Sequence, residues 1–95
     1  MTTKEKLMTI INNDNIVNTF GYLYERWQDE KEYEDINHYG ITIVSTINKE
    51  MPSLKAACIR ATKKPFGVKI YVDGILFHFY VKASKQYLSI RVKEA

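Results

Sequence analysis

The sequence predicts an α+β fold in which two or three N-terminal helices pack on one face of a C-terminal antiparallel meander of three or four strands. Apolar residues recur with helical spacing over residues 1–51 and alternate with strand spacing over residues 67–93. Asp73-Gly74, between two alternating segments, is the strongest short signal for a hairpin. The 95 residues suit a single domain, 1–95, whose helical part is acidic and whose sheet is basic.

Two helices are expected before residue 31. Thr2-Thr3-Lys4-Glu5 has the form of a capping box, and Asn12-Asn13-Asp14 should end this first helix and cap the next. The second helix carries a complete apolar stripe, and Gly21 within it would permit close packing of helices. The stripe consists of Ile16, Val17, Phe20, Leu23, Tyr24 and Trp27.

Two later segments leave alternatives open. A third stripe, with Asp35 as a candidate cap, has helical spacing, but its β-branched run ITIVSTI also fits a strand. Its members are Ile36, Gly40, Ile43, Val44, Ile47 and Met51. Pro52-Ser53 should end this segment. The following LKAACIRAT fits a helix capped by Ser53 and, equally well, a strand with Ala57, Ile59 and Ala61 on one face.

The two turns of the meander predict its register. A two-residue turn at Asp73-Gly74 places Ile70 opposite Phe77 and Val68 opposite Phe79. A second turn centred on Ser84-Lys85 would pair Val81 with Leu88, Phe79 with Ile90 and Phe77 with Val92. One face is then wholly apolar and suits a covering layer of helices.

The same register places cations and tyrosines on the outer face. Its central row is Lys69-His78-Arg91, with Tyr71-Leu76-Lys93 beside it, Tyr80 opposite Ser89, and Lys82 opposite Tyr87. Cations neutralise phosphates and tyrosine rings stack on bases, so this face predicts contact with nucleic acid or with an acidic protein surface. An ordinary solvated sheet face is the competing interpretation. The candidate contacts are Lys63, Lys64, Lys69, Tyr71, His78, Tyr80, Lys82, Tyr87, Arg91 and Lys93.

His78 should be neutral at pH 7, because flanking cations at Lys69 and Arg91 would lower its pKa. Charge is also divided along the chain. Residues 51–95 carry nine basic and two acidic residues, a net of +7, whereas residues 1–50 carry five basic and nine acidic residues, a net of −4.

The acidic segment ERWQDEKEYED, residues 25–35, is either a solvated helix face or a phosphate-mimicking surface for a partner. The candidate acidic contacts are Glu25, Asp29, Glu30 and Glu32.

Catalytic patterns are sparse. No His-x-x-x-His or Cys-x-x-Cys spacing exists for a metal, and Glu34 with His38 is a single chance pair. Cys58, the only cysteine, sits among apolar residues and suits an inert buried thiol. We therefore expect no enzyme, no catalytic residue, no metal, no cofactor and no small-molecule substrate.

Composition suggests a setting. Ile and Lys, eleven residues each, are encoded by AT-rich codons, which points to a low-GC bacterium or its phage. The chain has no long apolar run, so we expect a cytoplasmic protein without contact to the membrane. Its size and composition are similar to those of phage accessory proteins, some of which inhibit CRISPR nucleases.

Three functional hypotheses follow. The first is a binding protein that contacts nucleic acid or an acidic protein through the basic sheet face. The alternative is an anti-CRISPR-like inhibitor that binds a nucleic-acid-handling defence enzyme, through the sheet or the acidic segment. The third is a homodimer in which opposite charges pair between subunits.

Overall fold

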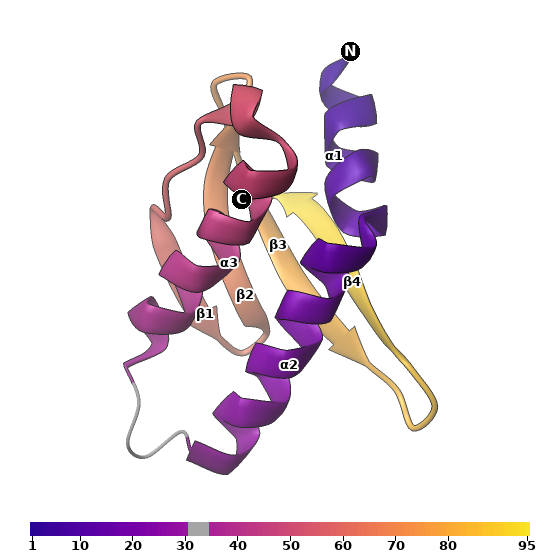
Figure 1. The fold of residues 1–95 in the computed structure, drawn as a ribbon, viewed down its shortest axis with the longest axis vertical. Helices are drawn as coiled ribbons and strands as arrows, with labels where there is room; N and C mark the ends of the chain where they lie inside the picture. The colour runs from indigo at the N-terminus through magenta and orange to yellow at the C-terminus, as the bar shows by residue number, and fades with distance from the viewer. Residues whose placement is uncertain (31–34) are drawn as a thin grey trace.

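The computed structural model describes residues 1–30 and 35–95, without the side chain of Glu30. Three helices are followed by a sheet with the strand order β1-β2-β3-β4, all neighbours antiparallel. The helices lie on one side of the sheet (Figure 1), which confirms the predicted α+β arrangement. The elements are α1 (Thr3–Asn12), α2 (Asp14–Glu30), α3 (Ile36–Glu50), the 3₁₀ turn η1 (Pro52–Leu54), β1 (Arg60–Lys63), β2 (Phe66–Val72), β3 (Ile75–Ala83) and β4 (Leu88–Glu94).

Side-chain caps fix where the helices begin. Thr2 and Glu5 form the predicted capping box, in which the Thr2 hydroxyl accepts from the Glu5 amide and the Glu5 carboxylate accepts from the Thr2 amide, each at 3.1 Å. The Asn13 side chain accepts from the amide of Ile16, and the Asp35 side chain accepts from that of Asn37. The polar residues at each boundary therefore satisfy amides that the helices leave open.

The two ambiguous segments adopt different structures. The stripe after Asp35 is helix α3, and its β-branched residues Ile43, Val44 and Ile47 are buried against the other elements. In LKAACIRAT, neither alternative holds throughout. Leu54 ends η1, Lys55 has a left-handed φ of 48°, and only the residues from Arg60 onward form a strand.

The first hairpin has the predicted register. Asp73 and Gly74 both have positive φ, 52° and 79°, as a two-residue turn of type I′ requires. Val72 faces Ile75, and the pairing continues to Gly67 opposite Tyr80.

The register predicted for the second hairpin is wrong by two residues. Phe79 lies opposite Val92 rather than Ile90, Phe77 opposite Glu94, and Val81 opposite Ile90. The connection is a four-residue loop, Ser84–Tyr87, in which the Ser84 amide donates to the Tyr87 carbonyl at 2.9 Å. A shift of two residues keeps every side chain on its predicted face, because side chains alternate with a period of two.

The core lies between the helices and the inward face of the sheet. α3 contacts β1 and β2, whereas α1 and α2 both contact β4. The close packing of helices predicted at Gly21 is not observed. The atom nearest to an added Cβ would be Leu88 Cδ2 of β4, at 3.8 Å. The buried core consists of Ile10, Ile16, Phe20, Leu23, Trp27, Tyr39, Ile43, Val44, Ile47, Phe66, Val68, Ile70, Val72, Phe77, Phe79, Val81 and Ile90.

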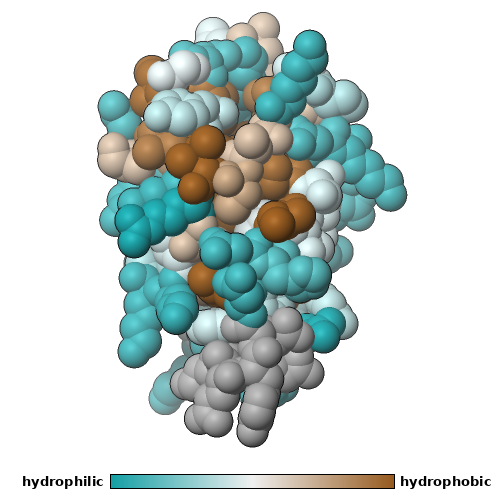
Figure 2. Space-filling view, turned by 90° about the vertical axis from the view of Figure 1, so that its left-hand side faces the viewer, coloured by the Kyte–Doolittle hydropathy of each residue, from teal (hydrophilic) through white to brown (hydrophobic). Residues whose placement is uncertain are grey.

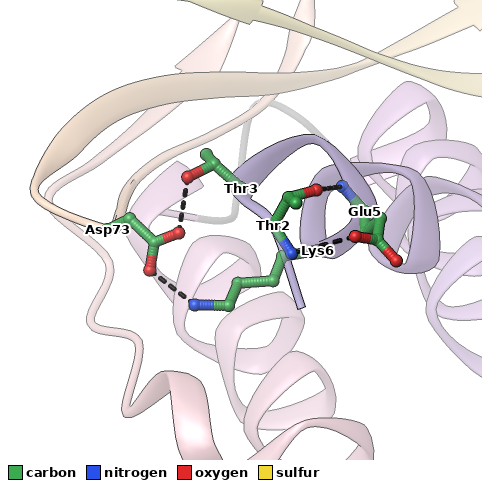
Figure 3. A network of polar contacts seen from close by, with 5 residues as sticks. All are labelled: Thr2, Thr3, Glu5, Lys6 and Asp73. Atoms are coloured by element: carbon green, nitrogen blue, oxygen red, sulfur yellow. Dashed lines mark hydrogen bonds and ion pairs between the residues drawn. The ribbon is translucent and has the colours of Figure 1, made fainter.

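The first helix is fastened to the tip of the β2–β3 hairpin. The Lys6 ammonium lies 2.6 Å from one carboxylate oxygen of Asp73, and the Thr3 hydroxyl donates to the other at 2.6 Å (Figure 3). These two donors lower the pKa of the Asp73 carboxyl. The turn residue that sets the hairpin register therefore also holds α1 in place.

Candidate nucleic-acid interface

The outward face of the sheet is basic. β-strand alternation and the observed register place Arg60, Lys69, His78 and Lys93 in one row across all four strands. Lys82 and Arg91 lie on the same face, where Arg91 is opposite Tyr80 and Lys82 is opposite Ser89. None of the outward positions of the four described strands carries an acidic residue. In Figure 1 the helices lie on the opposite side of the sheet, so no described helix covers this face.

His78 lies at the centre of this face and is only 5% exposed. Its Nε2 atom is 2.8 Å from the hydroxyl oxygen of Thr62, and that hydroxyl donates its own proton to the Pro65 carbonyl at 2.7 Å. Since a hydroxyl has a single proton to give, the Thr62 oxygen must accept from His78. The hydrogen-bond network thus assigns a proton to Nε2.

The environment of His78 disfavours a second proton. Burial lowers the pKa of His78, and the nearby charges of Lys69 and Lys93 lower it further. The direction agrees with the sequence prediction, but the cause differs. Burial is the largest contribution, and the second cation is Lys93 rather than Arg91 because of the shift in the β3–β4 register.

Two tyrosines lie on the outward face, and they differ in how far their rings are exposed. Tyr71 is 52% exposed. Tyr80 is half-buried, with its ring centroid 5.3 Å from that of His78 and the Lys93 ammonium 5.3 Å from its ring centroid. Tyr71 is therefore the ring already open to a stacking base, whereas Lys93 would have to move for a base to reach the same side of Tyr80.

Three predicted contacts lie away from this face. Tyr87 is exposed in the β3–β4 loop, where it lines a hollow together with Tyr24 and Glu25 of α2. Lys63 extends over the ring of Trp27 in α2, with its ammonium 5.9 Å from the ring centroid. Lys64 follows β1 in the turn to β2.

Arg60 was missing from the sequence-derived set, although it ends the central row. The strand alternative for LKAACIRAT, with Ile59 and Ala61 inward, already implied that Arg60 would point outward.

The acidic candidates are described in part. Glu25 and Asp29 are exposed in the second half of α2. Glu30 ends that helix with a side chain outside the described set, and Glu32 lies outside the described residues altogether. The sheet thus presents cations on the side opposite to the helix that carries these two carboxylates.

Metal ligation, the thiol of Cys58 and the apolar character of the helices bear on other functions. Among the described residues, no group of three or more His, Cys, Asp or Glu side chains could hold a metal ion, and Glu34 lies outside that set. Cys58 is half-buried, and burial raises the pKa of its thiol. None of the described helices has the length and apolar character needed to cross a membrane.

Comparison of the chain with protein-family models, with curated proteins and with solved structures finds no match.

Proposed function

We propose that this protein is a non-catalytic binding protein whose outward sheet face contacts single-stranded nucleic acid. One observation carries the proposal: five cations and two tyrosines share a sheet face that has no acidic residue at its outward positions and no described helix over it. The cations are Arg60, Lys69, Lys82, Arg91 and Lys93.

The division of roles follows from geometry and charge. The cations neutralise phosphates along the strand, a contribution that does not depend on base sequence. Tyr71 offers an exposed ring, and stacking on such a ring tolerates any base. Unpaired bases can reach this ring, whereas the bases of a duplex are stacked on one another, so a single strand suits the face better than a duplex.

Salt dependence tests the electrostatic part. Fluorescence anisotropy of labelled single- and double-stranded DNA and RNA, titrated at two salt concentrations, gives the affinity and its slope against salt. If each of the five cations neutralises one phosphate, the logarithm of the binding constant for a single strand should fall with a slope of about −3.5. Absence of binding at low salt would contradict the proposal.

A pair of matched variants locates the surface. Lys69→Glu combined with Arg91→Glu reverses two outward charges and should abolish binding. Lys4→Glu combined with Lys49→Glu reverses two exposed lysines of α1 and α3 and should leave most of the affinity intact, apart from the change in net charge. Equal loss in both variants would mean that net charge alone drives binding. Circular dichroism would confirm that each variant is folded.

The same variants separate this function from inhibition of a defence enzyme through the acidic segment. An inhibitor acting through Glu25 and Asp29 should tolerate the loss of Lys69 and Arg91, and Glu25→Gln combined with Asp29→Asn should abolish its activity. A nucleic-acid-binding sheet gives the reverse pattern.

A further inference from the structure

A groove follows the free edge of the sheet. β1 is the edge strand, and β2 is its only neighbour in the described sheet. The groove has a volume of about 490 Å³ and is lined by all four residues of β1, by Lys64, and by Ile36 and Asn37 in the first turn of α3. The amide of Asn37 donates to the Asp35 side chain, so this amide is not open to an occupant of the groove.

The lining is basic, with apolar surface beside it. Arg60, Lys63 and Lys64 are exposed, and none of the described residues lining the groove is acidic. Ile59, just before β1, is 52% exposed, and Ile41 of α3 is 61% exposed. Viewed from the side of β1 and α3, the molecule shows hydrophobic atoms gathered above the centre of this face, with hydrophilic atoms around them (Figure 2).

Close approach of α3 to the edge segment keeps these features together. A Cβ atom on Gly40 would lie 2.8 Å from Cys58 Sγ and 2.9 Å from Ala61 Cβ, so only glycine allows this spacing. Ile41 follows Gly40 in the helix, and Cys58 precedes Ile59 in the edge segment. An occupant of the groove would therefore meet the β1 backbone and its cations, with Ile36 in the lining and Ile59 next to the strand.

A second copy of this chain is a poor occupant. An edge strand can pair with another strand through its open backbone groups, and like charges brought together across such a pair destabilise it. Pairing of β1 with β1 of another molecule would collect three cations from each copy at one edge. An acidic segment has the opposite charge and suits the same backbone.

We propose that this groove binds an extended acidic segment of a partner protein, which adds to the sheet alongside β1. Main-chain hydrogen bonds supply affinity in this mode of recognition, and alternate side chains supply specificity. This surface is distinct from the one proposed for nucleic acid, although Arg60 lies at the border of both.

Strand alternation predicts the sequence pattern of the partner. Arg60 points outward, whereas Ala61, Lys63 and the preceding Ile59 point toward the helices. In an antiparallel partner, acidic residues should lie opposite Lys63 and Arg60, and apolar residues opposite Ala61 and Ile59. The expected order is acidic, any residue, apolar, acidic, apolar. A labelled peptide that contains Glu-Thr-Val-Glu-Val between flexible ends is a suitable probe.

Charge reversal gives the first test. Anisotropy of the labelled peptide, titrated with the full chain, should show binding that weakens at least about tenfold in Lys63→Glu combined with Lys64→Glu. Lys4→Glu combined with Lys85→Glu makes the same change in net charge away from the groove and should retain binding. A scrambled peptide of the same composition should bind more weakly. Unchanged affinity in the groove variant, or equal affinity for the scrambled peptide, would overturn the proposal.

Backbone methylation of the peptide gives the second test and leaves the protein unaltered. One edge of an added strand faces β1 and the other faces solvent. Peptides methylated on alternate amides should therefore differ, one set losing binding and the other keeping it. Equal behaviour of both sets would exclude strand addition.

Other occupants have their own signatures. A concentration-dependent dimer in light scattering that Lys63→Glu with Lys64→Glu dissolves would assign the groove to a second copy. Binding of an oligonucleotide that the same variant abolishes, without peptide binding, would assign it to nucleic acid. Both results would overturn the peptide proposal. The nucleic-acid proposal has separate variants at Lys69 and Arg91, so its failure would be recognised independently.

Discussion

The two faces of the sheet bury their side chains by different means. On the inward face, Phe79 and Ile70 are fully buried beneath the helices. On the outward face, His78 is almost as buried although no described helix covers it, because Thr62 of β1 reaches its Nε2 atom from the far side of β2, and the ring of Tyr80, in the same strand as His78, lies beside it. One face is therefore an interior, whereas the other is a surface with the buried His78 at its centre.

The largest difference should be in stability. Phe79→Ala removes a fully buried ring and should lower the free energy of unfolding by about 3–5 kcal/mol. Tyr71→Ala removes a half-exposed ring from the outward face and should cost about 0.5–1 kcal/mol. Urea denaturation followed by circular dichroism measures both. Similar losses for the two variants would show that something also covers the outward face in solution.

The affinity for nucleic acid should depend on the outward face, although that face contributes less to stability. Tyr71→Ala should weaken the affinity for a single strand by about 1–3 kcal/mol, or about 5- to 150-fold, if a base stacks on this ring. Tyr22→Ala on α2 is the matched control, since Tyr22 is 63% exposed on the helical side. Anisotropy at low salt measures both variants. Equal effects of the two substitutions would remove stacking on the sheet from the proposed function.

His78 gives the outward face a dependence on pH. Its pKa is lower in the folded protein than in the unfolded chain, so the unfolded chain takes up a proton first as the pH falls. The free energy of unfolding should therefore decrease as the pH falls below about 6.5, the usual pKa of histidine, with a slope of at most about 1.4 kcal/mol per pH unit from this group.

His78→Gln is the matching variant, because glutamine can still donate to the Thr62 hydroxyl but does not titrate. Urea denaturation between pH 5 and 7.5 should give a flatter profile for the variant than for the natural protein. Parallel profiles would place the origin of the pH dependence elsewhere.

The smallest effect should lie at the hairpin tip. Lys6 and Thr3 lower the pKa of Asp73, so this carboxylate stabilises the fold above the usual pKa of aspartate, about 3.9, and the contribution is lost as the pH falls through its lower folded value. Asp73→Asn keeps a residue that tolerates positive φ but removes the titrating charge. Acid unfolding followed by circular dichroism should be less steep below pH 4 in the variant. An unchanged acid transition would show that the contact adds nothing measurable.

The two hairpins show why only part of the interface could be predicted. A two-residue turn of type I′ requires positive φ at both positions, and Asp73 and Gly74 tolerate it, so the pairing of β2 with β3 could be predicted. The loop Ser84–Tyr87 contains no residue with such a requirement, and its polar residues fit several loop lengths. The predicted sheet face of each side chain was still correct. The predicted neighbour of His78 was wrong, because Lys93 takes the place expected for Arg91.

Contacts between distant segments were harder to predict than the alternation of side chains along each strand. The burial of His78 depends on Thr62, and Thr62 belongs to a strand that the sequence left undecided. The groove along β1 depends on that same strand and on the approach of α3 at Gly40. Local spacing specifies which face a residue occupies, whereas contacts between distant segments emerge only when the layers are assembled.

The contact between α1 and the hairpin tip has a consequence for folding. Its two hydrogen bonds join residues that are 67 and 70 positions apart in the chain, so a long loop must close before either bond can form. The sheet hairpins, by contrast, close over short connections. We expect α1 to dock after the strands have paired and to be the first element to undock in the native protein. Its amides should then exchange with solvent through a local opening that leaves the amides of β2 and β3 protected.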